Sequence, residues 1–209
     1  AAVEAAGRDA VYVEHLRRIL EPLIAEGMEP LFWADALRGD PSLAAKIPEG
    51  ATPIVWCYEA AVPEEHRPEL PAELTAVLDS LGIHIDLDGF APVLEPIAET
   101  GIPHWVAPGT SSWSSLVGRL DNALANLAEA AEAGRASGAS GYLVTDWGDH
   151  GHLQGPSLSY GPLLYGGAVS WGLDANRDVD LVPLLDDRVF HDRTHRLGSA
   201  LDALGRVWR

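Results

Sequence analysis

The stretch that decides the fold reads YLVTDWGDHGH at residues 142–152. It begins as an apolar run and ends abruptly in a Trp, two carboxylates, two His and two Gly. An apolar strand that stops in polar and aromatic residues is typical of an α/β barrel, which presents its site at the carboxyl ends of the strands. The two Gly favour a close approach of the backbone to another group.

Three more short apolar runs precede this stretch, at residues 29–33, 52–58 and 102–107, and each carries a Trp. With residues 142–145 they predict four strands, rich in β-branched and aromatic residues, separated by helices. Continuous apolar strands that alternate with helices indicate a parallel sheet. We therefore expect the four Trp to meet beyond the strand ends, and they are Trp33, Trp56, Trp105 and Trp147.

Helical spacing of apolar residues predicts the segments between the strands. A helix over residues 9–27 has its apolar stripe at Tyr12, Leu16, Ile19, Leu20 and Leu23. A long helix opens at Ser114 or Ser115 and runs to about Arg135, with a core face of Leu116, Leu120, Ala123, Leu124 and Leu127. Further helices are expected at residues 72–81, 90–100, 157–171, 179–190 and 194–208.

The predicted fold class is α/β, of the (β/α)₈ TIM-barrel type, with only about the last four βα units present. A whole barrel needs roughly 250 residues, and the chain has 209. We expect residues 1–175 to form the carboxyl-terminal half of the barrel and residues 176–209 to form a helical tail that packs on it or leaves it. Four parallel strands leave two open edges, so the expected partner is a missing amino-terminal half-barrel or a second copy.

Composition excludes several classes of function. There are 14 basic and 31 acidic residues, a net charge of −17, which argues against nucleic acid and anionic membranes as partners. The same charge favours a neutral or cationic ligand. No apolar run reaches the length of a membrane span, so a soluble protein is expected, cytoplasmic or secreted. A single cysteine, Cys57, permits no internal disulfide, and no phosphate-binding or nucleotide motif indicates a cofactor.

The strand-end residues suit a sugar, because an indole stacks on pyranose C–H groups while carboxylates accept hydrogen bonds from hydroxyls. Alternation places Trp56 and Tyr58 on one side of their strand and directs Cys57 to the other. The candidate binding residues are Trp33, Asp35, Trp56, Tyr58, His104, Trp105, Trp113, Asp146, Trp147, Asp149 and His152.

Three other interpretations stay open for these motifs. Trp147 and Asp149 also suit a core indole and a helix cap. Asp146, Asp149, His150 and His152 are acceptable metal ligands, which would indicate a metal-dependent hydrolase. The serines between residues 111 and 115 lack a Gly-x-Ser-x-Gly elbow, so they are expected to cap the next helix and shape its loop.

The ordered series FWAD (32–35), APGTSSW (107–113) and TDWGDHGH (145–152) resembles the second half of family 20 glycoside hydrolases, the β-N-acetylhexosaminidases and their relatives. The resemblance runs from about Glu29 to Trp171 and implies a (β/α)₈ barrel. It also implies retaining hydrolysis of terminal β-linked N-acetylhexosamines, in which the substrate's acetamido oxygen is the nucleophile, unlike the usual scheme of two carboxylates.

By this resemblance Trp33 matches the family's fifth-strand Trp, which forms a wall of the pocket. Asp35 matches the acid that follows that Trp by two residues in the family. Trp147 closes the acetamido pocket, and Asp149 stands where the family has a hydroxyl-binding Glu. The family's seventh-strand Tyr is replaced by His104 and Trp105, so either Tyr58 or His104 takes its role, or N-acetyl specificity is lost. The family's catalytic Asp-Glu pair would precede Ala1.

Three hypotheses follow. The first is that this chain supplies the sugar-binding half of a glycosidase site and does not cleave glycosides alone. The second is a non-catalytic carbohydrate-binding or assembly module, and the third is the metal-dependent hydrolase.

Overall fold

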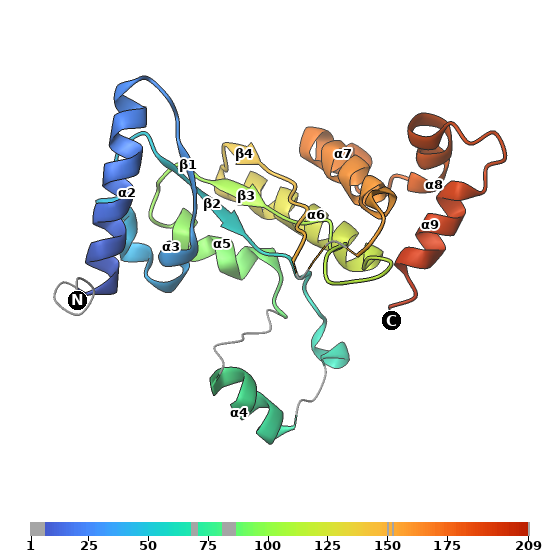
Figure 1. Ribbon diagram of the computed structural model, residues 1–209, viewed down its shortest axis with the longest axis horizontal. Coiled ribbons are helices and arrows are strands. Elements are labelled where there is room, and N and C mark those ends of the chain that lie inside the picture. The colour runs from blue at the N-terminus through green and yellow to red at the C-terminus, as the bar shows by residue number, and fades with distance from the viewer. Residues whose placement is uncertain (1–6, 68–70, 81–86, 150, 152, 209) are drawn as a thin grey trace.

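The computed structural model describes residues 7–67, 71–80, 87–149, 151 and 153–208. In these ranges four parallel strands form one sheet in the order β1-β2-β3-β4 (Figure 1). Their order in the sheet is their order in the chain. The strands are β1 (Leu31–Trp33), β2 (Thr52–Trp56), β3 (Trp105–Ala107) and β4 (Gly141–Tyr142). This confirms the predicted α/β class with a parallel sheet.

Helices fill the segments between and after the strands. They are α2 (Arg8–Ala25), α3 (Asp35–Gly39), η1 (Pro41–Lys46), η2 (Glu64–His66), α4 (Ala72–Ser80), α5 (Phe90–Ala98), α6 (Leu120–Ser137), η3 (Pro156–Ser159), α7 (Tyr160–Asn176), α8 (Leu181–Leu184), η4 (Leu185–Phe190) and α9 (Leu197–Gly205). The helices predicted at residues 9–27, 72–81 and 90–100 are confirmed to within a few residues. The helix predicted over 179–190 is a short α-helix that continues as a π-helix.

The predicted start of the long helix is wrong. α6 begins at Leu120, because the preceding loop holds Ser111, Ser114 and Gly118 at positive φ, where a right-handed helix cannot run. The loop is closed by a hydrogen bond from the Arg119 N–H to the Ser111 carbonyl at 3.1 Å. Leu116 is therefore not a core residue, and it is 74% exposed.

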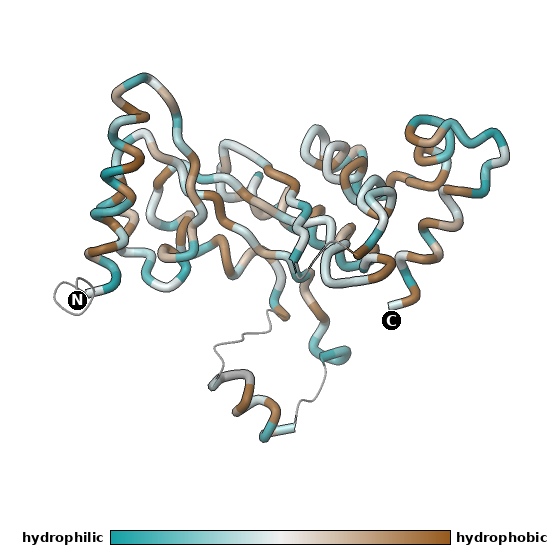
Figure 2. The backbone as a smooth tube through the Cα atoms, viewed as in Figure 1, coloured by the Kyte–Doolittle hydropathy of each residue, from teal (hydrophilic) through white to brown (hydrophobic). Residues whose placement is uncertain are grey.

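The main core joins one face of the sheet to α2, α3, α5 and α6. Phe32, Val55, Cys57 and Val106 alternate with the Trp positions along the strands, and these four residues belong to that core. Helix α2 contributes Val13, Leu16 and Leu20. Hydrophobic and hydrophilic residues alternate along this helix in Figure 2. Ile19 was expected in this stripe but is exposed. The buried Cys57 agrees with its interpretation as a small core residue.

A second core cluster lies between α6 and α7 and continues into the carboxyl-terminal helices. Leu127 of α6 and Tyr165 of α7 pack in it with Leu181 and Leu185. Figure 1 shows α7, α8 and α9 at the end of the molecule opposite to α2. The chain after residue 176 thus packs on the preceding helices, while the division at residue 176 stays a prediction. Among the described residues, no helix is long and apolar enough to span a bilayer.

The two outer strands each pair with a single neighbour in the described sheet. β1 pairs only with β2, and β4 pairs only with β3. Pairing beside β4 extends past its last residue, because Thr145 donates its N–H to the Pro108 carbonyl and accepts from the Thr110 N–H, both at 2.9 Å. This extension brings residues 145–149 beside the loop that follows β3.

Candidate functional site

Six of the predicted residues line one cavity of about 270 Å³ beyond the ends of β1 and β2. They come from three separate parts of the chain and comprise four aromatic rings and two carboxylates. The lining is Trp33, Asp35, Trp56, Tyr58, Trp147 and Asp149. The parallel sheet brings them together because the carboxyl ends of neighbouring parallel strands share one edge.

The four lining rings form three contacting pairs, one of which joins Tyr58 to Trp147 at 6.5 Å between centroids. Trp33 and Trp147 lie 5.6 Å apart between centroids, inclined at 49°. Trp56 and Tyr58 are stacked at 5.0 Å with 21° between their planes, as expected from residues on the same side of one strand. Tyr58 also meets Trp113 edge-on at 5.1 Å, so Trp113 supports the pocket from behind Tyr58 without lining it.

Tyr58 is the polar centre of this aromatic wall. Its hydroxyl oxygen accepts a hydrogen bond from the Trp147 indole N–H at 2.9 Å. Burial raises the pKa of Tyr58 above its ordinary value, and Asp35 and Asp149 add to this, while side-chain hydrogen bonding with Thr145 and Trp147 acts in the opposite direction. The phenol is therefore neutral at physiological pH and keeps its proton for donation to an acceptor.

The two carboxylates are at the open side of the cavity. Asp35 is the first residue of α3, and its Oδ2 accepts from the Trp56 indole N–H at 3.4 Å. The Arg38 guanidinium lies 4.5 Å from the centroid of the Trp56 ring and donates to the Trp56 carbonyl. Arg38 is not a lining residue. Asp35 and Asp149 are both exposed, as acids that bind an incoming ligand need to be.

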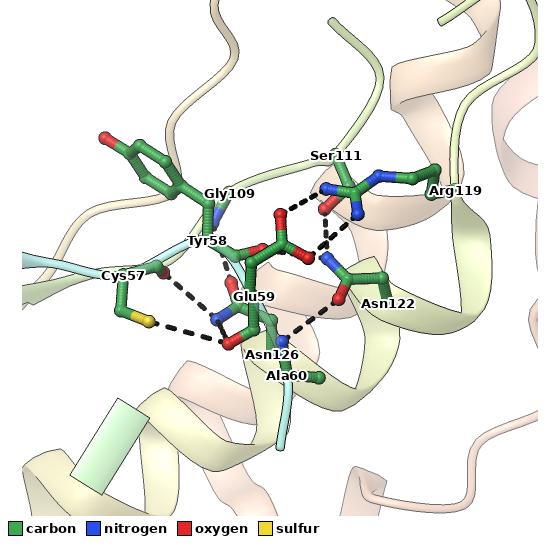
Figure 3. Close-up of polar contacts among 9 residues, drawn as sticks. All are labelled: Cys57, Tyr58, Glu59, Ala60, Gly109, Ser111, Arg119, Asn122 and Asn126. Carbon is green, nitrogen blue, oxygen red and sulfur yellow. Dashed lines mark hydrogen bonds and ion pairs between the residues drawn. The ribbon is translucent and has the colours of Figure 1, made fainter. Parts of the chain in front are cut away.

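Two amides on α6 hold the strand-end loops that carry the aromatic wall (Figure 3). Asn126 is fully buried; its Oδ1 accepts from the Gly109 N–H at 3.1 Å, and its Nδ2 donates to the Cys57 carbonyl at 3.0 Å. One turn earlier, Asn122 donates to the Tyr58 carbonyl and accepts from the Ala60 N–H. A single helix therefore fixes the loops after β2 and after β3.

An ion pair completes this support. Arg119 donates to both carboxylate oxygens of Glu59, at 2.6 and 2.8 Å (Figure 3). Because the pair is partly exposed, it contributes little to stability. Its main effect is to fix the positions of the two segments that it joins. It ties the residue after Tyr58 to the residue before α6.

Two predicted site residues lie elsewhere. Trp105 is the first residue of β3, not the last, and its indole covers Gly141 so closely that a Cβ there would overlap it. His104 precedes the strand and is buried, with Nδ1 3.0 Å from the Ile102 carbonyl and Nε2 2.9 Å from the Ser137 hydroxyl. Both ring nitrogens are thus used within the fold. Of the two candidates for the family's Tyr role, Tyr58 alone lines the pocket.

Asp146 is also not a lining residue. Its Oδ1 accepts from the hydroxyls of Thr110 and Ser112, at 2.7 and 2.9 Å, and this network joins the residue to the loop after β3. Ser111 and Ser112 shape that loop as expected, but no side chain caps α6.

The metal interpretation depends on two residues that the structure does not describe. His150 and His152 lie outside the described residues. The sugar-binding role expected of His152 therefore stays a prediction. Among the described residues there is no group of three or more potential metal ligands. Of the two proposed ligands that the structure describes, Asp149 lines the cavity and Asp146 does not.

The supporting residues Asn126, Arg119 and Arg38 were not predicted. The sequence does carry a signal for the two amides, because Asn122 and Asn126 stand four residues apart on the apolar face of α6. A buried amide needs partners, and spacing by one helical turn directs both at the same neighbour.

A scan against protein-family models finds no match to this chain, and a search of curated proteins finds none either.

Proposed function

We propose that this chain supplies the sugar-binding half of a glycoside hydrolase site that acts on hexosamine glycosides. The observation that supports the proposal best is the cavity walled by Trp33, Trp56, Tyr58 and Trp147 with Asp35 and Asp149 at its rim. Aromatic rings stack on pyranose C–H groups, and carboxylates accept hydrogen bonds from hydroxyls. The site requires no cofactor in this proposal.

In the proposed complex the sugar ring packs against the indoles. The Tyr58 hydroxyl, already an acceptor for the Trp147 N–H, donates to an oxygen of the sugar's 2-substituent. Asp35 and Asp149 accept from ring hydroxyls. This arrangement agrees with the resemblance to β-N-acetylhexosaminidases, with Tyr58 in the role of the acetamido-binding Tyr.

The general acid in this proposal comes from the other half of the barrel, which this chain does not contain. The order β1-β2-β3-β4, parallel throughout, is that of successive strands in a (β/α)₈ barrel. In the described sheet, the outer edges of β1 and β4 have no neighbouring strand. Their backbone groups can therefore pair with further strands. A preceding half-barrel or a second copy of the chain would close it and bring the acid to the cavity.

Titration calorimetry with N-acetylglucosamine tests the proposal, with 4-nitrophenyl N-acetyl-β-glucosaminide as the substrate for turnover. We expect the chain alone to bind the sugar without hydrolysing the substrate. Trp147→Ala should abolish binding. Trp171→Ala, which removes an indole that is 93% exposed on α7, is the matched control and should bind normally.

Lack of binding by the unmodified chain, or equal binding by Trp147→Ala, would refute the sugar site. Binding without turnover, when the missing amino-terminal half of the barrel or a second copy of the chain is supplied, would favour a non-catalytic carbohydrate-binding module. Turnover by the completed barrel would establish the enzyme.

A further inference from the structure

The charge of the cavity is one-sided. Among the described residues its lining contains two carboxylates, Asp35 and Asp149, and no basic side chain. The guanidinium of Arg38 lies over the Trp56 ring, but Arg38 does not line the cavity. Within the described ranges, no ion pair joins either acid to Lys, Arg or His. Glu59 shows the contrast, since a nearby Arg119 neutralises it. The net charge of −17 adds a long-range field of the same sign.

Aromatic rings beside carboxylates are the chemistry that recognises an organic ammonium ion. A cation within about 6 Å of a ring centroid is attracted by the ring quadrupole, most strongly for Trp. Three of the four rings here are indoles, and Trp33 and Trp147 are inclined to each other instead of stacked flat. Two nearby carboxylates add direct Coulomb attraction, and they repel a sugar that carries its own carboxylate or sulfate.

We infer that this cavity prefers a hexosamine with a free ammonium group over the neutral sugar of the same size. The inference rests on the proposed sugar site and adds the charge of its ligand. Whereas the resemblance to β-N-acetylhexosaminidases implies an acetylated sugar, the uncompensated pair Asp35 and Asp149 favours the unacetylated one. A pyranose still stacks on the indoles, and its ammonium group takes the place of a hydroxyl that faces the acids. In this orientation the Tyr58 contact proposed for an acetamido oxygen is not made.

Calorimetry on the full chain at about pH 6, where an aliphatic amine is charged, tests this with three methyl β-glycosides: the glucosaminide, the glucoside and the N-acetylglucosaminide. We expect the glucosaminide to bind about tenfold more tightly than the glucoside in low salt. Because part of this advantage is screened electrostatics, it should shrink in about 1 M salt.

The double variant Asp35→Asn and Asp149→Asn should reduce the affinity ratio of glucosaminide to glucoside to about one. Asn keeps an oxygen that can accept from the Trp56 N–H, so the fold is preserved. Glu49→Gln is the matched control: it removes one exposed carboxylate from the turn that precedes β2, away from the cavity, and should leave the ratio intact.

Equal or tighter binding of the N-acetylglucosaminide or the glucoside would overturn the inference and leave the sugar site standing. An affinity ratio that survives the double variant would overturn it as well. If none of the three glycosides binds, both the sugar site and the ammonium preference fall.

Discussion

Replacing Asn126 of α6 should both lower the stability of the fold and disturb the loops that carry the site. Its side chain is inaccessible to solvent, accepts from the Gly109 N–H at 3.1 Å and donates to the carbonyls of Cys57 and Glu59 at 3.0 and 3.4 Å. Asn126→Ala removes the acceptor of the buried Gly109 N–H and a donor to the buried Cys57 carbonyl. Each loss costs about 1–3 kcal/mol, so we expect a loss of about 2–4 kcal/mol in the free energy of unfolding.

Asn126→Asp is nearly isosteric and should nevertheless be worse than Asn126→Ala at neutral pH. It retains an acceptor for the Gly109 N–H but places a buried negative charge against two carbonyl oxygens, which costs several kcal/mol. Folding must raise the pKa of that carboxyl, so its penalty falls as the pH is lowered and the protonated acid donates to Cys57.

Urea denaturation followed by tryptophan fluorescence measures both variants, with the slope m checked for constancy. Ala125→Ser, on the exposed side of the same helix, is the control and should change stability by less than about 0.5 kcal/mol. The reasoning is refuted if Asn126→Ala matches that control, or if Asn126→Asp is no less stable than Asn126→Ala.

Three more predictions follow from single contacts. Gly141→Ala should cost about 2 kcal/mol or more because its Cβ would overlap the Trp105 indole, whereas Gly167→Ala in α7, with open space around it, should stabilise by about 0.5–1 kcal/mol; thermal unfolding compares the two. Tyr58→Phe should lower affinity for N-acetylglucosamine about tenfold in calorimetry, and unchanged affinity would exclude its proposed donor role. Burial raises the pKa of Glu129 above its ordinary value of 4.5, so its contribution to stability is present in acid and is lost as pH rises through the folded-state pKa. Urea titrations should therefore show Glu129→Gln gaining stability relative to the unmodified protein as the pH is raised above that ordinary value.

Much of the architecture was predictable because its determinants are local. The alternation through residues 52–58 correctly separated Trp56 and Tyr58 from the buried Cys57. The strand-end rule then correctly brought Trp33 and Trp147 together across the sheet. These predictions needed only periodicity and the shared edge of parallel strands.

The failures arose where a side chain's role is set by distant neighbours. Trp105 looks like the other strand-end indoles, but pairing with Ile54 and Gly141 makes it the first residue of β3. Ser114 looks like a helix cap, but the left-handed backbone of its loop delays α6 to Leu120. Neither register nor a positive φ at a non-glycine residue is encoded in local propensity.

The inclined indoles of Trp33 and Trp147 give the cavity a spectroscopic property of its own. Two identical chromophores held close together at a fixed oblique angle couple their electronic transitions, and such coupling produces a paired band in circular dichroism. A ligand that enters between or beside the rings changes their relative orientation and so the shape of that band. Binding of a ligand in the cavity should therefore change this band on the unlabelled protein.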